Sequence, residues 1–191
     1  MIGYYVVPRL VRGIQNGLAV ALDPADEPRD DVDAITENVY MFSKSDELFM
    51  QRALSLAEGA AFNQEVPVGA VLVHEDKIIA EAYNRPISLC DPSAHAEMLA
   101  LRKGALHANN YRLINTTLYV TLEPCLMCVG AIHHARVKRV VFGAYDKRAG
   151  AVESVFPIGH NENLHHRVIY EGGLFETQSV ALLQNFFKTR R

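Results

Sequence analysis

The chain has 191 residues, of which 49% are hydrophobic, and a formal net charge of −3 at pH 7. This length suffices for one domain with a sizeable core, and no apolar run is long enough to predict a membrane span. The near-neutral charge excludes a protein that binds nucleic acid through a strongly basic surface, so phosphate contacts would need local clusters. The candidate clusters are 136–139, 147–148 and 188–191, and for the first we favour an ordinary solvated surface.

The beginning of the chain is acidic. Residues 1–43 hold seven carboxylates against three arginines, whereas the remainder has a net charge of +1. The stretch Asp23–Glu37 also contains two prolines, a composition that predicts a linker or a disordered or weakly ordered segment. We therefore expect an N-terminal extension over 1–43 and one folded domain over 44–191. Because Met41 follows this break, one hypothesis is that residues 1–40 are dispensable or not made.

After residue 43 the hydrophobic pattern alternates between helical and strand periods. Ser45 and Asp46 supply a cap and first-turn charge for a helix that runs to about Asn63. The further elements expected in chain order are strands 66–73 and 78–83, helix 94–107, strand 117–121, helix 125–134, strand 137–142, strand 168–170 and helix 177–188. Strands that alternate with helices predict an α/β domain with a mixed five-stranded sheet flanked by helices.

Two short strings thirty residues apart predict a catalytic metal site. They are His95-Ala96-Glu97 and Pro124-Cys125-Leu126-Met127-Cys128, which match the H-x-E…P-C-x-x-C pattern of zinc-dependent nucleobase deaminases. One imidazole and two thiolates give Zn²⁺ three ligands and leave its fourth position open for water, so that zinc-bound hydroxide is available at neutral pH. Glu97 is not a ligand in this scheme and can carry protons from the water to the ring nitrogen and the leaving amine.

Other interpretations of the cysteines remain open. A CxxC pair also occurs in redox proteins and in structural zinc sites. A structural site is normally closed by four protein ligands, however, and this chain has only three cysteines. The third, Cys90, is better interpreted as a partly buried free thiol than as a fourth ligand. This cysteine usage argues against a disulfide framework and predicts a reducing, cytoplasmic location.

Longer strings around these motifs resemble the bacterial tRNA adenosine deaminases. They are Glu65-Val66-Pro67-Val68-Gly69-Ala70-Val71, Asn84-Arg85-Pro86-Ile87, Asp91-Pro92-Ser93-Ala94-His95-Ala96-Glu97, Asn110-Tyr111-Arg112-Leu113, Leu118-Tyr119-Val120-Thr121-Leu122-Glu123-Pro124-Cys125 and Val141-Phe142-Gly143-Ala144-Tyr145-Asp146. The resemblance covers about residues 45–191. It implies a three-layer cytidine-deaminase-like fold and conversion of adenosine to inosine at wobble position 34 of a tRNA, in particular tRNA-Arg with an ACG anticodon.

The resemblance also assigns the metal, the partners and the chemical residues. It implies one Zn²⁺ per subunit, with His95, Cys125 and Cys128 as the metal ligands and Glu97 as the proton shuttle. The expected partners are the tRNA anticodon arm and a second copy of the chain, with no membrane partner and no DNA. We place the dimer surface on the helix 125–134 and the strand that follows it.

Four residues are expected to bind the substrate. By resemblance, Asn84 binds the nucleoside in the pocket, and Asp146 contacts the RNA backbone or sugar beside the target. The C-terminal helix, with Phe186, Phe187 and Arg190, resembles the element that holds flanking anticodon nucleotides. Two adjacent phenylalanines are more often core residues, so at most one of them is expected to face RNA, and we assign this role to Phe187.

Two other functions remain as alternatives. The zinc motif alone also fits a deaminase of a free base, nucleoside or nucleotide, such as cytosine or guanine. A non-catalytic, zinc-stabilised RNA-binding subunit is less favoured, because silent deaminase relatives typically lose the acid and Glu97 is present. The loop 153–166 departs from the family pattern, and we interpret its His160, His165 and His166 as surface or substrate-loop residues.

Overall fold

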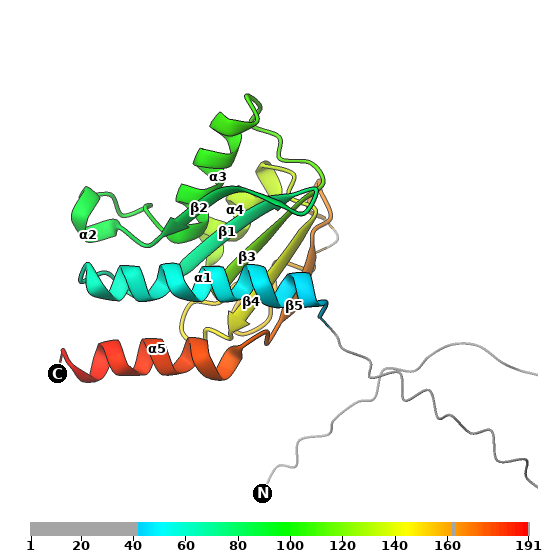
Figure 1. The fold of residues 1–191 in the computed structure, drawn as a ribbon. Coiled ribbons are helices and arrows are strands. Elements are labelled where there is room, and N and C mark those ends of the chain that lie inside the picture. The colour runs from blue at the N-terminus through cyan, green and yellow to red at the C-terminus, as the bar shows by residue number, and fades with distance from the viewer. Residues whose placement is uncertain (1–41, 162, 191) are drawn as a thin grey trace, which may run out of the picture. The chain divides into compact units, whose positions relative to one another are not determined.

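The computed structural model describes residues 42–161 and 163–190. All but the last two residues of the expected extension over 1–43 therefore lie outside the described residues. The elements, labelled in Figure 1, are α1 (Lys44–Phe62), β1 (Gly69–His74), β2 (Lys77–Tyr83), α2 (Pro86–Leu89), α3 (Ala96–His107), β3 (Thr116–Leu122), α4 (Leu126–His134), β4 (Arg139–Ala144), β5 (Ile169–Gly172) and α5 (Glu176–Lys188). In the part of the chain that is described, no helix is both long and apolar enough to cross a bilayer.

The five strands form one mixed sheet in the order β2-β1-β3-β4-β5. Strand β1 is antiparallel to both β2 and β3, whereas the pairs β3–β4 and β4–β5 are parallel. The parallel pairs are joined through α4 and through the long segment after β4, as parallel crossovers require. The mixed five-stranded sheet flanked by helices that the sequence predicts is thus confirmed.

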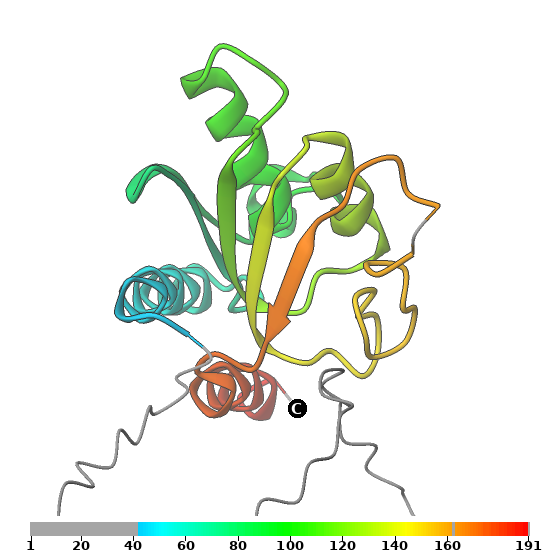
Figure 2. The same cartoon turned by 90° about the vertical axis from the view of Figure 1, so that its right-hand side faces the viewer.

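Alternate side chains of the strands enter two separate cores, which makes the domain three-layered. On β1, Leu72 belongs to the larger core with residues of α3 and α4, whereas its neighbour Val71 belongs to the smaller core with residues of α1. The period of two follows from the pleat of the strand. Figure 2 accordingly shows α1 and α5 on one face of the sheet and α3 and α4 on the other.

The strand register defines which loops share one edge of the sheet. Gly69 at the start of β1 pairs with Tyr83 at the end of β2, and Leu122 at the end of β3 pairs with Ala144 at the end of β4. The segments that follow β2, β3 and β4 therefore emerge at the same edge. All the substrate and metal residues expected from the sequence belong to these segments, to α3, α4 or α5, or, for Arg190, to the residues directly after α5.

An ion pair, buried at Asp46 and partly exposed at Arg139, joins α1 to β4 near the other edge. The Arg139 guanidinium donates to both oxygens of Asp46 at 2.6 and 3.1 Å and to Glu171 at 2.6 Å, and the Tyr119 hydroxyl donates to Asp46 at 2.7 Å. Burial alone would raise the pKa of Asp46, but these bonds and those from Ser43 lower it well below its ordinary value. Our interpretation of the 136–139 cluster as solvated surface is therefore wrong for Arg139.

Candidate metal centre and substrate groove

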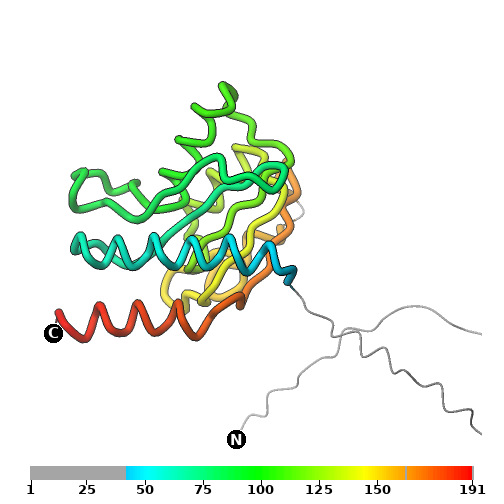
Figure 3. The backbone as a smooth tube through the Cα atoms, in the orientation of Figure 1, coloured from blue at the N-terminus to red at the C-terminus, as the bar shows by residue number. Residues whose placement is uncertain are grey.

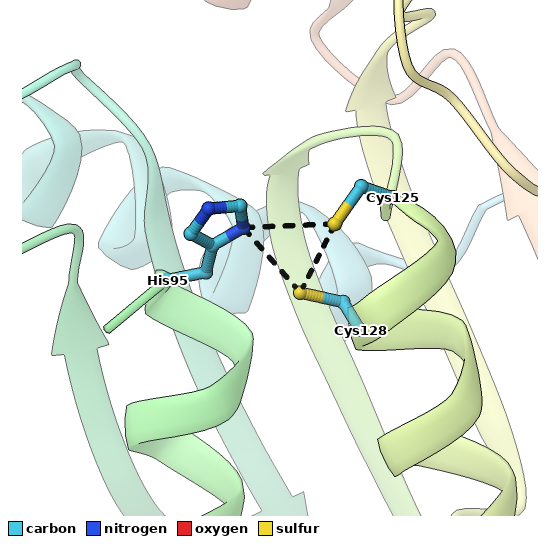
Figure 4. Close-up of side chains that lie close together, drawn as sticks. All are labelled: His95, Cys125 and Cys128. Atoms are coloured by element: carbon cyan, nitrogen blue, oxygen red, sulfur yellow. Dashed lines mark hydrogen bonds between the residues drawn. The ribbon is translucent and has the colours of Figure 1, made fainter. Parts of the chain in front are cut away.

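Three potential metal ligands meet where α3 and α4 begin. His95 and Cys125 are the N-cap residues of these helices, and neither side chain makes a capping hydrogen bond. Cys128 lies in the first turn of α4. The Nδ1 atom of His95 is 3.7 Å from the sulfur of Cys125 and 3.6 Å from that of Cys128, and the two sulfurs are 3.7 Å apart (Figure 4). The sequence predicted that Cys125 lies inside the helix, whereas its N-cap position leaves the side chain free to face His95.

The triangle of donor atoms has the dimensions of a zinc site. Zinc bonds of about 2.3 Å to sulfur and about 2.05 Å to nitrogen, set at tetrahedral angles, give edges of about 3.8 Å between sulfurs and about 3.6 Å between sulfur and nitrogen. The measured edges agree with these values, so the three residues fit Zn²⁺ with one corner left open. Among residues 42–161 and 163–190 no other three His, Cys, Asp or Glu side chains converge in this way, which leaves Cys90 and the loop histidines outside the centre.

Of the two thiols in the centre, Cys125 favours the thiolate form. Contact with Cys128 and with His95 lowers the pKa of Cys125 to about 4, although burial opposes the shift. The contact with Cys125 raises the pKa of His95. The contact with Cys125 and burial together raise the pKa of Cys128. Metal ligands must be deprotonated, so a metal bound here competes with protons on Cys128 and His95.

Glu97 lies in the first turn of α3, beside the three ligands. Its side chain is only 4% exposed, and burial raises its pKa, while a hydrogen-bond contact with Cys128 acts in the opposite direction. A raised pKa suits a carboxyl that must both accept and donate a proton near neutrality. The structure therefore places a buried carboxyl in contact with Cys128, one corner of the ligand triangle.

Asn84 is buried between the end of β2 and the start of α3. Its side-chain Oδ1 accepts a 2.8 Å bond from the backbone N–H of Ala96, and its backbone N–H donates to the carbonyl of Val68 at 3.0 Å. With Oδ1 occupied, the Nδ2 donor is what the amide can offer a substrate. Nearby, the carboxylate of Glu65 accepts bonds from Ile87 and Ser88 at 3.2 and 2.7 Å. Our sequence analysis missed this role of Glu65, for which a single acid directly before the apolar run 66–73 was the available signal.

A groove of about 760 Å³ runs between the segment after β4 and helix α5. Asp146 lies on one wall and Phe187 on the other, so the structure brings these two expected substrate residues together. Phe187 is 45% exposed and Phe186 only 8%, so Phe187 is the ring of the pair that a ligand in the groove could reach.

Arg190 instead points back to the chain. Its guanidinium stacks on the Phe186 ring at 4.0 Å, and Nη2 donates to Gln64 at 2.7 and 2.8 Å. This contact joins the residues that follow the two helices, and Figure 3 shows that the C-terminal ends of α1 and α5 lie side by side.

Comparison with known proteins identifies the family. A model described as the cytidine and deoxycytidylate deaminase zinc-binding region matches residues 43–144. The tRNA-specific adenosine deaminase of Haemophilus influenzae is 48% identical over 150 residues, which cover 78% of this chain and 87% of that protein. A solved structure from a study of A-to-I editing by tRNA:A34 deaminases is 42% identical, with a TM-score of 0.69, and covers 71% of this chain and 99% of its own. Guanine deaminase from Bacillus subtilis is 34% identical, with a TM-score of 0.53, and covers 75% of this chain and 92% of its own.

The fold and the matched zinc-binding region define an enzyme of the hydrolytic deaminase class. The chain belongs to the cytidine and deoxycytidylate deaminase family and, within it, to the tRNA-specific adenosine deaminases. This confirms the family and the fold that the sequence resemblance implies.

Proposed function

We propose that this protein hydrolyses adenosine to inosine at position 34 of a tRNA, with tRNA-Arg carrying an ACG anticodon as its first substrate. The observation that carries the chemistry is the triangle of His95, Cys125 and Cys128 with the buried Glu97 beside it. The higher identity to tRNA deaminases than to guanine deaminase favours the RNA substrate. The long groove along α5 supports it further, because a free base has no flanking nucleotides to fill it.

In this proposal His95, Cys125 and Cys128 hold one Zn²⁺ per subunit. When bound, the metal supplies a Lewis acid that lowers the pKa of a water ligand towards neutrality. Glu97 accepts a proton from the attacking water and delivers it to N1 of the adenine ring as C6 is attacked. A second proton passes through Glu97 to the departing amine, so that adenosine and water give inosine and ammonia. The Nδ2 donor of Asn84 orients the nucleoside.

The RNA is held beyond the target base. A nucleotide in an anticodon loop is already partly unstacked, so extruding it costs less than extruding a base from a duplex. Asp146 and Phe187, on opposite walls of the groove, are proposed to contact the flanking sugar and base. Arg190 is proposed to reach phosphate with its remaining N–H donors, since Gln64 occupies Nη2.

A homodimer is the proposed assembly, with α4 as its surface. This helix leaves Leu126, Met127, Gly130 and His134 exposed. Such an apolar strip fits a second copy of the chain. The strand after it, β4, lies between β3 and β5 and is buried from Val140 onward, so we now propose α4 without that strand.

The deaminase domain is proposed to span residues 44–191, because the family match begins at residue 43. A variant that starts at Met41 should then keep the wild-type kcat and KM, and loss of either would contradict this boundary. We also propose a cytoplasmic location, because thiolate ligands need reduced cysteines. Fractionation of native cells tests the location, and recovery with an extracytoplasmic fraction would refute it.

The function is tested by offering the wild-type protein four substrates in parallel. These are an anticodon stem-loop with ACG, free adenine, cytosine and guanine, with inosine and ammonia measured and zinc quantified on the same sample. We expect inosine from the stem-loop alone and one zinc per chain. Ammonia from a free base without inosine would establish the free-base deaminase instead. Bound zinc without any turnover would indicate a non-catalytic RNA-binding subunit. A Cys125–Cys128 disulfide in a protein without zinc would indicate a redox protein.

A further inference from the structure

A second buried glutamate organises the wall of the groove that faces α5. Glu123, which follows β3 and precedes Pro124 and Cys125, is only 2% exposed. Its carboxylate accepts backbone N–H bonds from Asp146 at 3.0 Å, Val152 at 3.0 Å, Glu153 at 2.8 Å and Ser154 at 3.0 Å, and also a bond from the Ser154 hydroxyl. One side chain thus satisfies four backbone donors of a segment that has no helix or ladder of its own, where buried N–H groups would otherwise be costly.

The two residues after Glu123, Pro124 and Cys125, hold the same loop through their backbone. The N–H of Ala151 donates to the carbonyl of Pro124 at 2.8 Å, and Gly150 forms an isolated bridge with Cys125. A Cβ atom on Gly150 would lie 2.3 Å from the Glu123 carboxylate, so the loop fits against this side chain without spare room. The wall of the groove and a candidate metal ligand are therefore attached to one element.

The loop presents groups suited to nucleotides. Its turn, residues 145–149, lines the groove opposite Phe187, and the Asp146 carboxylate accepts a 2.9 Å bond from the N–H of Arg148. The side chains of Lys147 and Arg148 are exposed. Cations beside an aromatic face are the combination that holds the phosphates and bases of single-stranded RNA.

We propose that Glu123 is a positioning residue for the RNA substrate. It fixes the 145–149 turn at the distance from α5 that the nucleotides next to the target require. It acts through the loop and touches neither the base nor the metal, so it governs substrate affinity and leaves the chemical step unchanged. This inference rests on the proposed function, because the nucleotides in question flank the edited adenosine.

The test is Glu123→Gln, which keeps the shape of the side chain. Its Nε2 replaces one acceptor oxygen with a donor, so the N–H groups of the loop lose part of their acceptor. We expect the KM for the ACG stem-loop to rise about tenfold, with kcat within about twofold and the zinc content unchanged. Hydrogen exchange at residues 146 and 152–154 should become faster, and this measurement does not depend on any activity.

Thr116→Val is the matched control, because it removes another buried hydrogen bond at the far end of the same strand. It should lower the melting temperature and leave KM unchanged. Loss of zinc, a fall in kcat at constant KM, or unchanged exchange in Glu123→Gln would each overturn the proposal. Should that variant fail to fold, Ser154→Ala removes a single donor and should still raise KM, and an unchanged KM there would also refute it. Wild-type turnover in the same assay separates failure of this inference from failure of the proposed function.

Discussion

The side-chain oxygen of Asn84 bonds the backbone N–H of Ala96 at 2.8 Å, the residue between His95 and Glu97. One amide therefore connects the end of β2 to the helix start that carries a candidate ligand and the candidate proton shuttle. The same amide is the expected nucleoside contact, so its two ends serve different purposes. Oδ1 holds the protein, and Nδ2 is available to the base.

Substitutions at Asn84 should separate these two purposes. Asn84→Asp keeps an acceptor for Ala96 and removes the donor, so we expect kcat/KM to fall by about tenfold to a hundredfold with little change in melting temperature. Asn84→Ala removes both groups and should also lower the free energy of unfolding by about 1 kcal/mol. Kinetics on the stem-loop and thermal denaturation measure the two effects. Wild-type kcat/KM in Asn84→Asp would exclude Nδ2 as a substrate contact.

Glu97→Gln should abolish turnover without loss of metal. The amide preserves the shape of the buried side chain but cannot accept and return a proton, so kcat should fall by more than about a hundredfold. Zinc content, measured on the same sample, should stay at the wild-type level because Glu97 is not among the three ligands. Glu58→Gln, an exposed position on α1, serves as the control and should change neither quantity. Retained activity in Glu97→Gln would rule out the proposed shuttle.

Phe187 should contribute to RNA binding by stacking. Removing the ring with Phe187→Ala should raise the KM for the stem-loop about tenfold, since one base stacked on an aromatic ring is worth about 1–3 kcal/mol. Phe187→Leu keeps an apolar side chain and should show most of the same loss if stacking is the cause. Wild-type KM in both variants would place the flanking bases elsewhere.

The Asp46–Arg139 pair should make stability dependent on acid pH. The pKa of Asp46 is depressed in the folded protein, so the pair contributes fully above the ordinary value of 3.8 and is lost as pH falls below it. Asp46→Asn should cost about 2 kcal/mol at pH 7, because Arg139 loses its more buried carboxylate partner and keeps only Glu171. Its unfolding free energy should also vary less between pH 5 and pH 3 in urea titrations.

The exposed Arg52–Glu81 pair provides the comparison. Arg52 Nε and Glu81 Oε1 lie 2.7 Å apart, but the two side chains are 46% and 30% exposed. Glu81→Gln should therefore cost less than about 1 kcal/mol. Equal losses in Glu81→Gln and Asp46→Asn would contradict the importance we give to burial.

Gly130 offers a direct test of the proposed dimer surface. It lies on the exposed face of α4, and a Cβ atom there meets nothing within 4 Å in the subunit. Gly130→Glu should therefore leave the fold intact and place a charge in the interface, which gives a monomer by light scattering. Gly59→Glu on α1 is equally free of contacts and should leave the dimer unchanged. A dimer that survives Gly130→Glu would move the interface away from α4.

Hydrophobic periodicity predicted the long elements within a few residues, because each buries one face against the sheet. It could not predict α2, since this four-residue helix is held by a partner outside it, the carboxylate of Glu65. Arg139 was misinterpreted for a related reason. Its basic neighbours in the sequence suggest a solvated cluster, whereas Asp46, 93 residues away in the chain, pairs with it in a partly buried position.

The candidate site was only partly accessible from the sequence. The motif identified the donor atoms, and chemistry alone suggested the metal. His95 and Cys125 are both N-cap residues whose side chains face each other across the two helix starts, which depends on how α3 and α4 pack and has no local signal. The role of Glu123 was hidden similarly, because its bonding partners lie 23–31 residues further along the chain.

The strand register has a practical consequence for work on this enzyme. Every group proposed to act on RNA emerges at one edge of the sheet, and the β1–β2 turn, residues 74–77, lies at the other. Strand β1 has six residues and so separates the two edges by about 20 Å. A fluorophore or an affinity handle inserted in this turn would report on the enzyme or immobilise it without entering the path of the anticodon.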